Sequence, residues 1–160
     1  MKDNATIVEL YRFKYTTFYT VKYDCDEMPL GLQFLKEYSQ HKHFKIFKTW
    51  IQKIGNERGA VGHFFRQERE AEALPPPKDI INESCDLRWY CLRINPAIVI
   101  MFNGGVKTKQ KAQHCPNVSK HFDEANKLAE QIWKEIEEAE NIRINPDDSL
   151  FILDSFKLNP

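Results

Sequence analysis

Apolar and polar residues alternate in the first part of the chain in the way that is typical of strands. Residues 5–23 are rich in β-branched and aromatic types. Every second side chain from Thr17 to Tyr23 shares one face of an extended chain, and the intervening ones share the other. This pattern predicts one or two strands, with a hairpin as the second alternative.

Two helical patterns follow. The segment "PLGLQFLKEYS" (residues 29–39) starts with a proline, which suits the first turn of a helix. Residues 41–55 carry apolar side chains at helical spacing, and this stripe consists of Phe47, Trp50, Ile51 and Ile54. Gly55 and Gly59 then predict the end of the second helix. We expect a pair of helices packed on a sheet.

The middle of the chain predicts a loop followed by a hairpin. Residues 66–84 contain three consecutive prolines, which favour an extended surface connection. Two apolar segments, 86–94 and 97–105, are separated by Asn95 and Pro96 and read as two paired strands. The second is apolar on both faces, which predicts a central strand covered on both sides.

The last part of the chain predicts a long helix over residues 119–140. Its apolar stripe consists of Phe122, Ala125, Leu128, Ala129, Ile132, Trp133 and Ile136. Residues 149–156, "SLFILDSF", form a possible edge strand. Together these elements predict a single α+β domain over residues 1–160. It has a mostly antiparallel, twisted sheet, an N-terminal helical pair and a C-terminal helix.

Length and composition agree with one folded domain. The chain has 160 residues, of which 42% are hydrophobic, enough for an ordinary core. No apolar run approaches the roughly 20 residues that span a bilayer. The start, "MKDNATIVELYRFKY", lacks the apolar centre of a signal peptide. We therefore expect a cytoplasmic protein with no membrane partner.

The charge is zero overall, with 23 basic and 23 acidic residues, but it is unevenly distributed. Residues 86–120 contain six lysines and arginines and one carboxylate. Residues 121–160 contain four lysines and arginines and ten carboxylates. The electrostatic potential near a surface governs the encounter with a charged partner. A chain with a net charge of zero can therefore still have a basic face that binds a polyanion.

The basic charge is concentrated after the second apolar segment, in "FNGGVKTKQKA" (residues 102–112), where lysines occupy every second position. If 86–94 pairs with 97–105, Arg88 lies near Gly104 and Gly105, which we expect to form a turn with accessible amides. An arginine fork, ammonium groups and free amides together suit a phosphodiester. The competing interpretation is a solvated loop that protects a sheet edge.

Two other residue types extend this candidate site. Tyr90 shares a strand face with Arg88, where it could stack on a base, or it is a half-buried residue of the sheet. His114 and His121 are the imidazoles nearest the lysines and can transfer protons, although surface histidines without chemistry are common.

The four cysteines, Cys25, Cys85, Cys91 and Cys115, form no CxxC pair. His114 and Cys115 are adjacent, which is poor geometry for two ligands of one metal, and a fourth ligand is missing beside His121. We expect free thiols, no metal and no cofactor.

The segment "DLRWYCLRINPAIVIMFNGGVKTKQKA", followed by an amphipathic helix, resembles the C-terminal half of the RelE/HigB toxin superfamily. The first strand, two helices and "HFFRQEREAEALPPP" resemble its HigB-like, phage-derived branch. The resemblance covers residues 16–136 and leaves 141–160 as a C-terminal extension. It implies a RelE-like fold and the toxin of a type II toxin–antitoxin system. Such a toxin cuts messenger RNA on the ribosome, using the RNA 2′-hydroxyl as nucleophile without a metal.

The resemblance matches Arg88 to the strand arginine that contacts phosphate, and it matches the lysines to the basic stretch that follows the apolar strand. With the nearby imidazole, the candidate catalytic residues are Arg88, Lys107, Lys109, Lys111 and His114. The candidate RNA- or phosphate-binding residues are Tyr90, Arg93, Gly104 and Gly105.

The same resemblance implies two partners, a cognate antitoxin of the helix-turn-helix type and messenger RNA on the ribosome. The alternative is an interaction protein of the same fold that cleaves nothing. Such a protein inhibits a protein target, for example gyrase, or pairs with a regulator.

Overall fold

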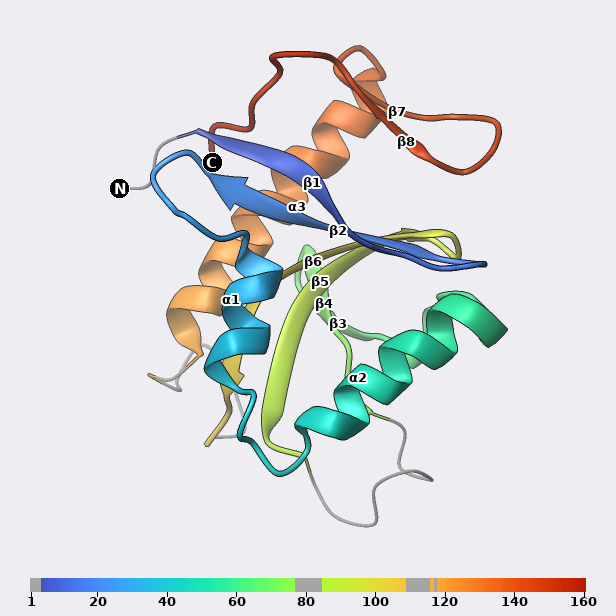
Figure 1. Cartoon of the computed structure of the whole chain (residues 1–160). Coiled ribbons are helices and arrows are strands. Elements are labelled where there is room, and N and C mark those ends of the chain that lie inside the picture. Colours follow the sequence, from blue (N-terminus) through green and yellow to red (C-terminus); the bar gives the residue numbers. More distant parts are fainter. Residues whose placement is uncertain (1–3, 77–84, 109–115, 117) are drawn as a thin grey trace.

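The structure is a computed structural model that describes residues 4–76, 85–108, 116 and 118–160 (Figure 1). Its main feature is a six-stranded sheet with the order β1-β2-β6-β5-β4-β3. The strands are β1 (Ala5–Arg12), β2 (Thr17–Tyr23), β3 (Arg66–Glu68), β4 (Ala71–Ala73), β5 (Leu87–Asn95) and β6 (Ile98–Val106). Neighbouring strands are antiparallel except for β2 and β6, which run parallel. The fold is therefore α+β with a mostly antiparallel sheet, as predicted.

In the part of the chain that the structure describes, three helices pack on this sheet. They are α1 (Leu30–Glu37), α2 (Phe44–Lys53) and α3 (Ser119–Glu138). The helices α2 and α3 cover opposite faces, and α1 supplies Leu30 to one core cluster and Phe34 to the other (Figure 1). The stripe predicted for α2 is buried in full, and five of the seven residues predicted for α3 are buried. The other two, Trp133 and Ile136, pack against that core.

Two short helical turns follow α2. Ile54–Arg58 (η1) forms a π-helical turn and Gly62–Phe64 (η2) a 3₁₀ turn. Gly59 ends the first turn with φ of 76°, a left-handed value that a side chain disfavours. The end predicted at Gly59 is therefore confirmed, whereas Gly55 lies within η1 and ends no helix.

The segment predicted as a connecting loop, residues 66–84, contains structure that the sequence pattern missed. The strands β3 and β4 pair with each other, and β4 continues the sheet beside β5. Each has only three residues, too short for alternation to stand out. Of the remaining residues, 77–84 lie outside the described part of the chain.

The C-terminal extension packs on the N-terminal edge of the molecule. Its strands β7 (Ile142–Ile144) and β8 (Leu150–Ile152) form a separate two-stranded sheet, so the predicted edge strand does not join the main sheet. Further along, Leu158 exchanges two backbone hydrogen bonds with Ala5, at 2.7 and 2.9 Å, and Lys157 pairs with Asp24. The extension is thus part of the same folded unit (Figure 1).

A buried threonine ties α1 to the sheet. The Thr20 hydroxyl donates to the Met101 carbonyl and accepts from the Gly31 amide, both at 2.8 Å. The first amides of a helix have no partner within the helix, so this hydroxyl satisfies one of them.

We expect Thr20→Val to lower the free energy of unfolding by about 2 kcal/mol. Valine has nearly the shape of threonine, but it leaves the buried Met101 carbonyl and Gly31 amide without the hydrogen bonds that the hydroxyl supplies. Urea unfolding of the two proteins measures this difference. Thr6→Val is the matched control, because Thr6 lies on β1 and makes no side-chain hydrogen bond among the described residues. Equal losses in both variants would contradict the role given to Thr20.

One negative finding concerns membranes. Among the described residues, no helix combines the length and the apolar character that crossing a bilayer requires.

Candidate functional site

The hairpin of β5 and β6 brings the predicted arginine to the predicted glycines. Its register pairs Leu87 with Val106, Arg88 with Gly105 and Trp89 with Gly104. The ladder extends one step further, since the Lys107 amide donates to the Asp86 carbonyl at 2.7 Å. The backbone of Lys107 is thus held beside the start of β5, two residues from Arg88.

The glycines themselves do not form the turn that we expected. Both lie within β6, which continues to Val106, and the register shifts between Trp89 and Cys91. A Cβ on Gly104 would lie 1.9 Å from the Arg88 carbonyl oxygen. Gly104 therefore permits a close approach of two backbones, and its amide donates to the Asn103 side chain at 2.9 Å. The prediction of free amides is wrong for Gly104.

Arg88 is half-buried at the start of β5. Its Nη1 donates to the Cys85 carbonyl at 2.6 Å and to the Leu87 carbonyl at 3.3 Å. Its Nε is buried and has no hydrogen-bond partner among the described residues. These contacts fix the guanidinium without neutralising its charge, because both acceptors are uncharged carbonyl groups.

A second cation adds to this charge. Burial lowers the pKa of Arg88, and the positive charge of Arg66 acts in the same direction. Arg66 is an exposed residue of the edge strand β3. Cys85, Tyr90 and Glu68 act in the opposite direction on this pKa, and no described residue forms an ion pair with Arg88. Among the described residues, the start of β5 therefore carries positive charge without an ion-pair partner, and this arrangement suits an anion.

The other predicted binding residues do not join this group. Tyr90 is 0% exposed, and its ring packs edge-on against Phe122 of α3, so it cannot stack on a base in this arrangement. Arg93 lies towards the opposite end of β5, where its Nε donates to the Ala60 carbonyl at 2.5 Å. Of the described members of the predicted cluster, Arg88, Gly105 and Lys107 thus remain together at one end of the hairpin. The other predicted site residues, Lys109, Lys111 and His114, lie outside the described part of the chain.

The structure also brings together three residues that the sequence pattern did not indicate. His41 Nε2 lies 3.0 Å from the Asp86 Oδ1 atom, and the His43 amide donates to His41 Nδ1 at 3.1 Å. One ligand atom from each of these residues lies within 4.8 Å of the other two. The histidines belong to the connection between α1 and α2, and Asp86 directly precedes β5.

Cys85, the neighbour of Asp86, is not part of that group. Its thiol faces the Leu87 carbonyl oxygen at 3.9 Å. Burial raises the pKa of this thiol, which keeps it protonated at neutral pH.

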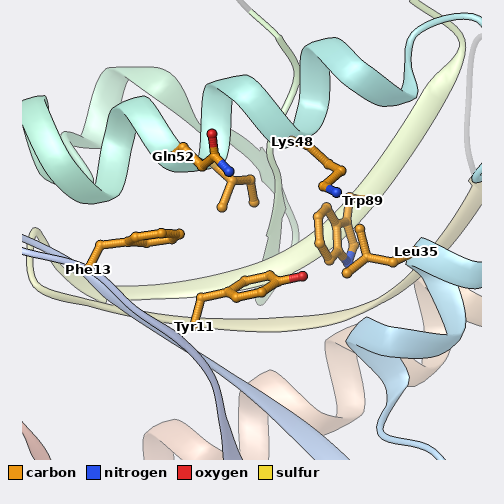
Figure 2. Close-up of a pocket in the computed structure, with 7 residues that line it drawn as sticks. Tyr11, Phe13, Leu35, Lys48, Gln52 and Trp89 are labelled. Carbon is orange, nitrogen blue, oxygen red and sulfur yellow. The ribbon is translucent and has the colours of Figure 1, made fainter.

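A cavity of about 180 Å³ lies on the α2 side of the sheet (Figure 2). It is lined by Tyr11, Phe13, Leu35, Lys48, Ile51, Gln52 and Trp89. Figure 2 shows the Lys48 side chain reaching from α2 towards Trp89. Trp89 and Arg88 are adjacent in β5 and point to opposite faces, so this cavity is separate from the arginine site. Its volume is below the range usual for a drug-sized ligand.

Comparisons of the chain with protein-family models, with curated proteins and with solved structures find no match. The arrangement around Arg88 can bind a phosphate through a half-buried guanidinium, with Arg66 adding charge and Lys107 following directly after the strand.

Proposed function

We propose that this protein is a toxin of the RelE/HigB type that binds messenger RNA on the ribosome and cuts it. The observation that carries the proposal is the half-buried guanidinium of Arg88, which has no ion-pair partner among the described residues and lies within the electrostatic influence of Arg66. A charged group taken out of water without an ionic partner is costly, so its presence favours an anionic ligand that restores the balance. The phosphate of a nucleic acid is such a ligand.

The placement of Arg88 suits transition-state stabilisation. In the proposed reaction the RNA 2′-oxygen attacks the adjacent phosphorus and the 5′-oxygen leaves, giving a cyclic phosphate. One proton leaves the 2′-hydroxyl and one joins the 5′-oxygen. Negative charge grows on the phosphoryl oxygens, and a guanidinium already fixed by two carbonyl groups can donate to them with little reorganisation.

Proton transfer falls to the basic segment in this proposal. Lys107 follows β6 directly, and its backbone is held against Asp86. Lys109, Lys111 and His114 follow in the sequence as further candidates. A cognate antitoxin of the helix-turn-helix type is the proposed regulator, because an unregulated messenger RNA nuclease stops growth.

We expect induction of the protein in a bacterial host to stop growth and to produce new messenger RNA ends within codons. Arg88→Gln should slow the appearance of these ends about 100-fold, as happens when one donor to a transition state is removed. A combined Lys107, Lys109 and Lys111→Ala variant should act in the same direction. Growth curves and primer extension on total RNA measure both effects.

Arg58→Gln is the matched control, because Arg58 is an exposed arginine of η1, a turn that follows α2 and carries none of the site residues. It should retain full toxicity, and circular dichroism should show that all variants are folded. Growth arrest without new ends would favour the alternative that the protein inhibits a protein target. Unaffected growth and intact messenger RNA would contradict the toxin proposal altogether.

A further inference from the structure

The His41, His43 and Asp86 group has the composition of a transition-metal site. Two imidazole nitrogens and one carboxylate oxygen are a common ligand set for zinc and for related divalent ions. The residues come from two segments 45 positions apart, and the fold brings their ligand atoms within 4.8 Å of one another. Such convergence of three ligand atoms at one point is the first requirement of a metal site.

The group is also held in place. His43 is 3% exposed and directly precedes α2, where its carbonyl accepts from the Phe47 amide at 3.1 Å. The backbone of Asp86 is held by its own carbonyl, which accepts from the Lys107 amide at the end of the β5–β6 ladder. His43 directly precedes α2 and Asp86 directly precedes β5, so the backbones that carry these two ligands keep their relative positions. Such rigidity favours the binding of a metal ion.

We propose that His41, His43 and Asp86 bind one divalent transition-metal ion, with zinc as the reference case. Ligands at about 2.0–2.2 Å from a tetrahedral ion lie roughly 3.3–3.5 Å from one another. The 3.0 Å separation of His41 Nε2 and Asp86 Oδ1 is close to this range, and the proposal requires the remaining ligand distances, which are within 4.8 Å, to shorten to it when the ion binds. Three protein ligands leave the fourth position to water or to an anion.

Binding requires a change at His41. In the metal-free arrangement His41 Nδ1 accepts from the His43 amide, so the proton of the neutral ring is on Nε2, facing Asp86. A metal ion bound at Nε2 replaces that proton. The neutral ring then carries its proton on Nδ1, which can no longer accept the hydrogen bond from the His43 amide. The side chains of His41 and Asp86 are 14% and 49% exposed, which gives an ion access to them from solvent.

This inference goes beyond the proposed function and does not rest on it. The proposed cleavage places no role on His41 or His43. A metal site here would stabilise the junction between the helical pair and β5. The bound ion would have an open coordination position. It would lie at Asp86, whose carbonyl accepts a hydrogen bond from the Lys107 amide.

The test uses the full chain, freed of metal by a chelator, and titrates it with Co²⁺ while visible absorption is recorded. We expect one ion per chain and the intense ligand-field bands of tetrahedral cobalt, which Zn²⁺ then abolishes by competition. Zn²⁺ should also raise the thermal midpoint, since a ligand that binds only the folded state stabilises it. Neither readout involves RNA, so failure here leaves the toxin proposal unaffected.

Three variants make the test specific. Asp86→Asn keeps an oxygen that accepts from His41 but removes the carboxylate, and we expect it to weaken binding at least about tenfold. His41→Ala should weaken it further without emptying the buried position of His43. His63→Ala, which removes an exposed histidine of η2, should leave binding unchanged.

The opposite results would overturn the inference. If wild-type protein binds no Co²⁺ and gains no stability from Zn²⁺, the three residues form only a hydrogen-bonded group. If Asp86→Asn and His41→Ala bind as tightly as wild type, or if His63→Ala abolishes binding, the ion sits on surface histidines elsewhere.

Discussion

Replacement of Gly104 with alanine is expected to lower the free energy of unfolding by about 3–5 kcal/mol. The added Cβ would lie 1.9 Å from the Arg88 carbonyl oxygen, 2.9 Å from its carbonyl carbon and 3.0 Å from the Trp89 Cα atom. All three are backbone atoms of the adjacent strand, so no side-chain rotation relieves the overlap. The two strands must separate, which breaks the ladder where the register already shifts.

Urea or thermal unfolding of purified protein checks this expectation. The matched control is Gly62→Ala, because a Cβ at Gly62 meets only the end of the Arg93 side chain, at 3.8 Å, which is ordinary contact. Gly62→Ala should change stability by no more than about 0.5 kcal/mol. Wild-type stability in Gly104→Ala would show that β5 and β6 are further apart than described, and the placement of Arg88 would lose its basis.

Replacement of Trp89 with alanine is expected to cost about 3–5 kcal/mol of stability. Trp89 is almost completely buried and stacks on Phe34, with ring centroids 4.4 Å apart and planes 14° apart. Its Nε1 donates to the Phe102 carbonyl at 2.7 Å. The variant therefore loses apolar contacts between β5 and α1 and leaves a cavity that the surrounding core fills only in part.

Trp89→Phe separates the two contributions. It keeps an aromatic ring against Phe34 and removes the hydrogen bond to Phe102, so we expect a smaller loss of about 1–2 kcal/mol. Denaturant unfolding followed by circular dichroism measures both variants without relying on tryptophan fluorescence. An equal loss in Trp89→Phe and Trp89→Ala would mean that ring stacking contributes little to the core.

The strength of local patterns explains which parts of the fold were predictable from the sequence. The helices α2 and α3 carry apolar stripes that only a helical period produces, and Asn95-Pro96 between two apolar runs predicts both strands and their pairing. The register of Arg88 against Gly105 followed from that hairpin. Strands β3 and β4 were missed because three residues show no periodicity.

The site was less predictable, because burial and long-range contacts depend on the whole fold. Alternation places Tyr90 on the side of Arg88 but does not reveal that Phe122 of α3 covers it. Gly104 has the sequence signature of a turn, and only the paired strand shows that it serves a close approach of backbones. His41 and Asp86 are 45 residues apart, so no local spacing indicates their contact.

The parallel pairing of β2 with β6 has a consequence for synthesis of the chain. Thr20 and Met101 are 81 residues apart and must meet before one edge of β2 is covered. At translation rates of about 5–20 residues per second, the N-terminal hairpin waits roughly 4–16 s for its partner. During that time an apolar strand with unpaired amides is open to other nascent chains, so yield on overexpression should improve when chaperones that cover such strands are abundant.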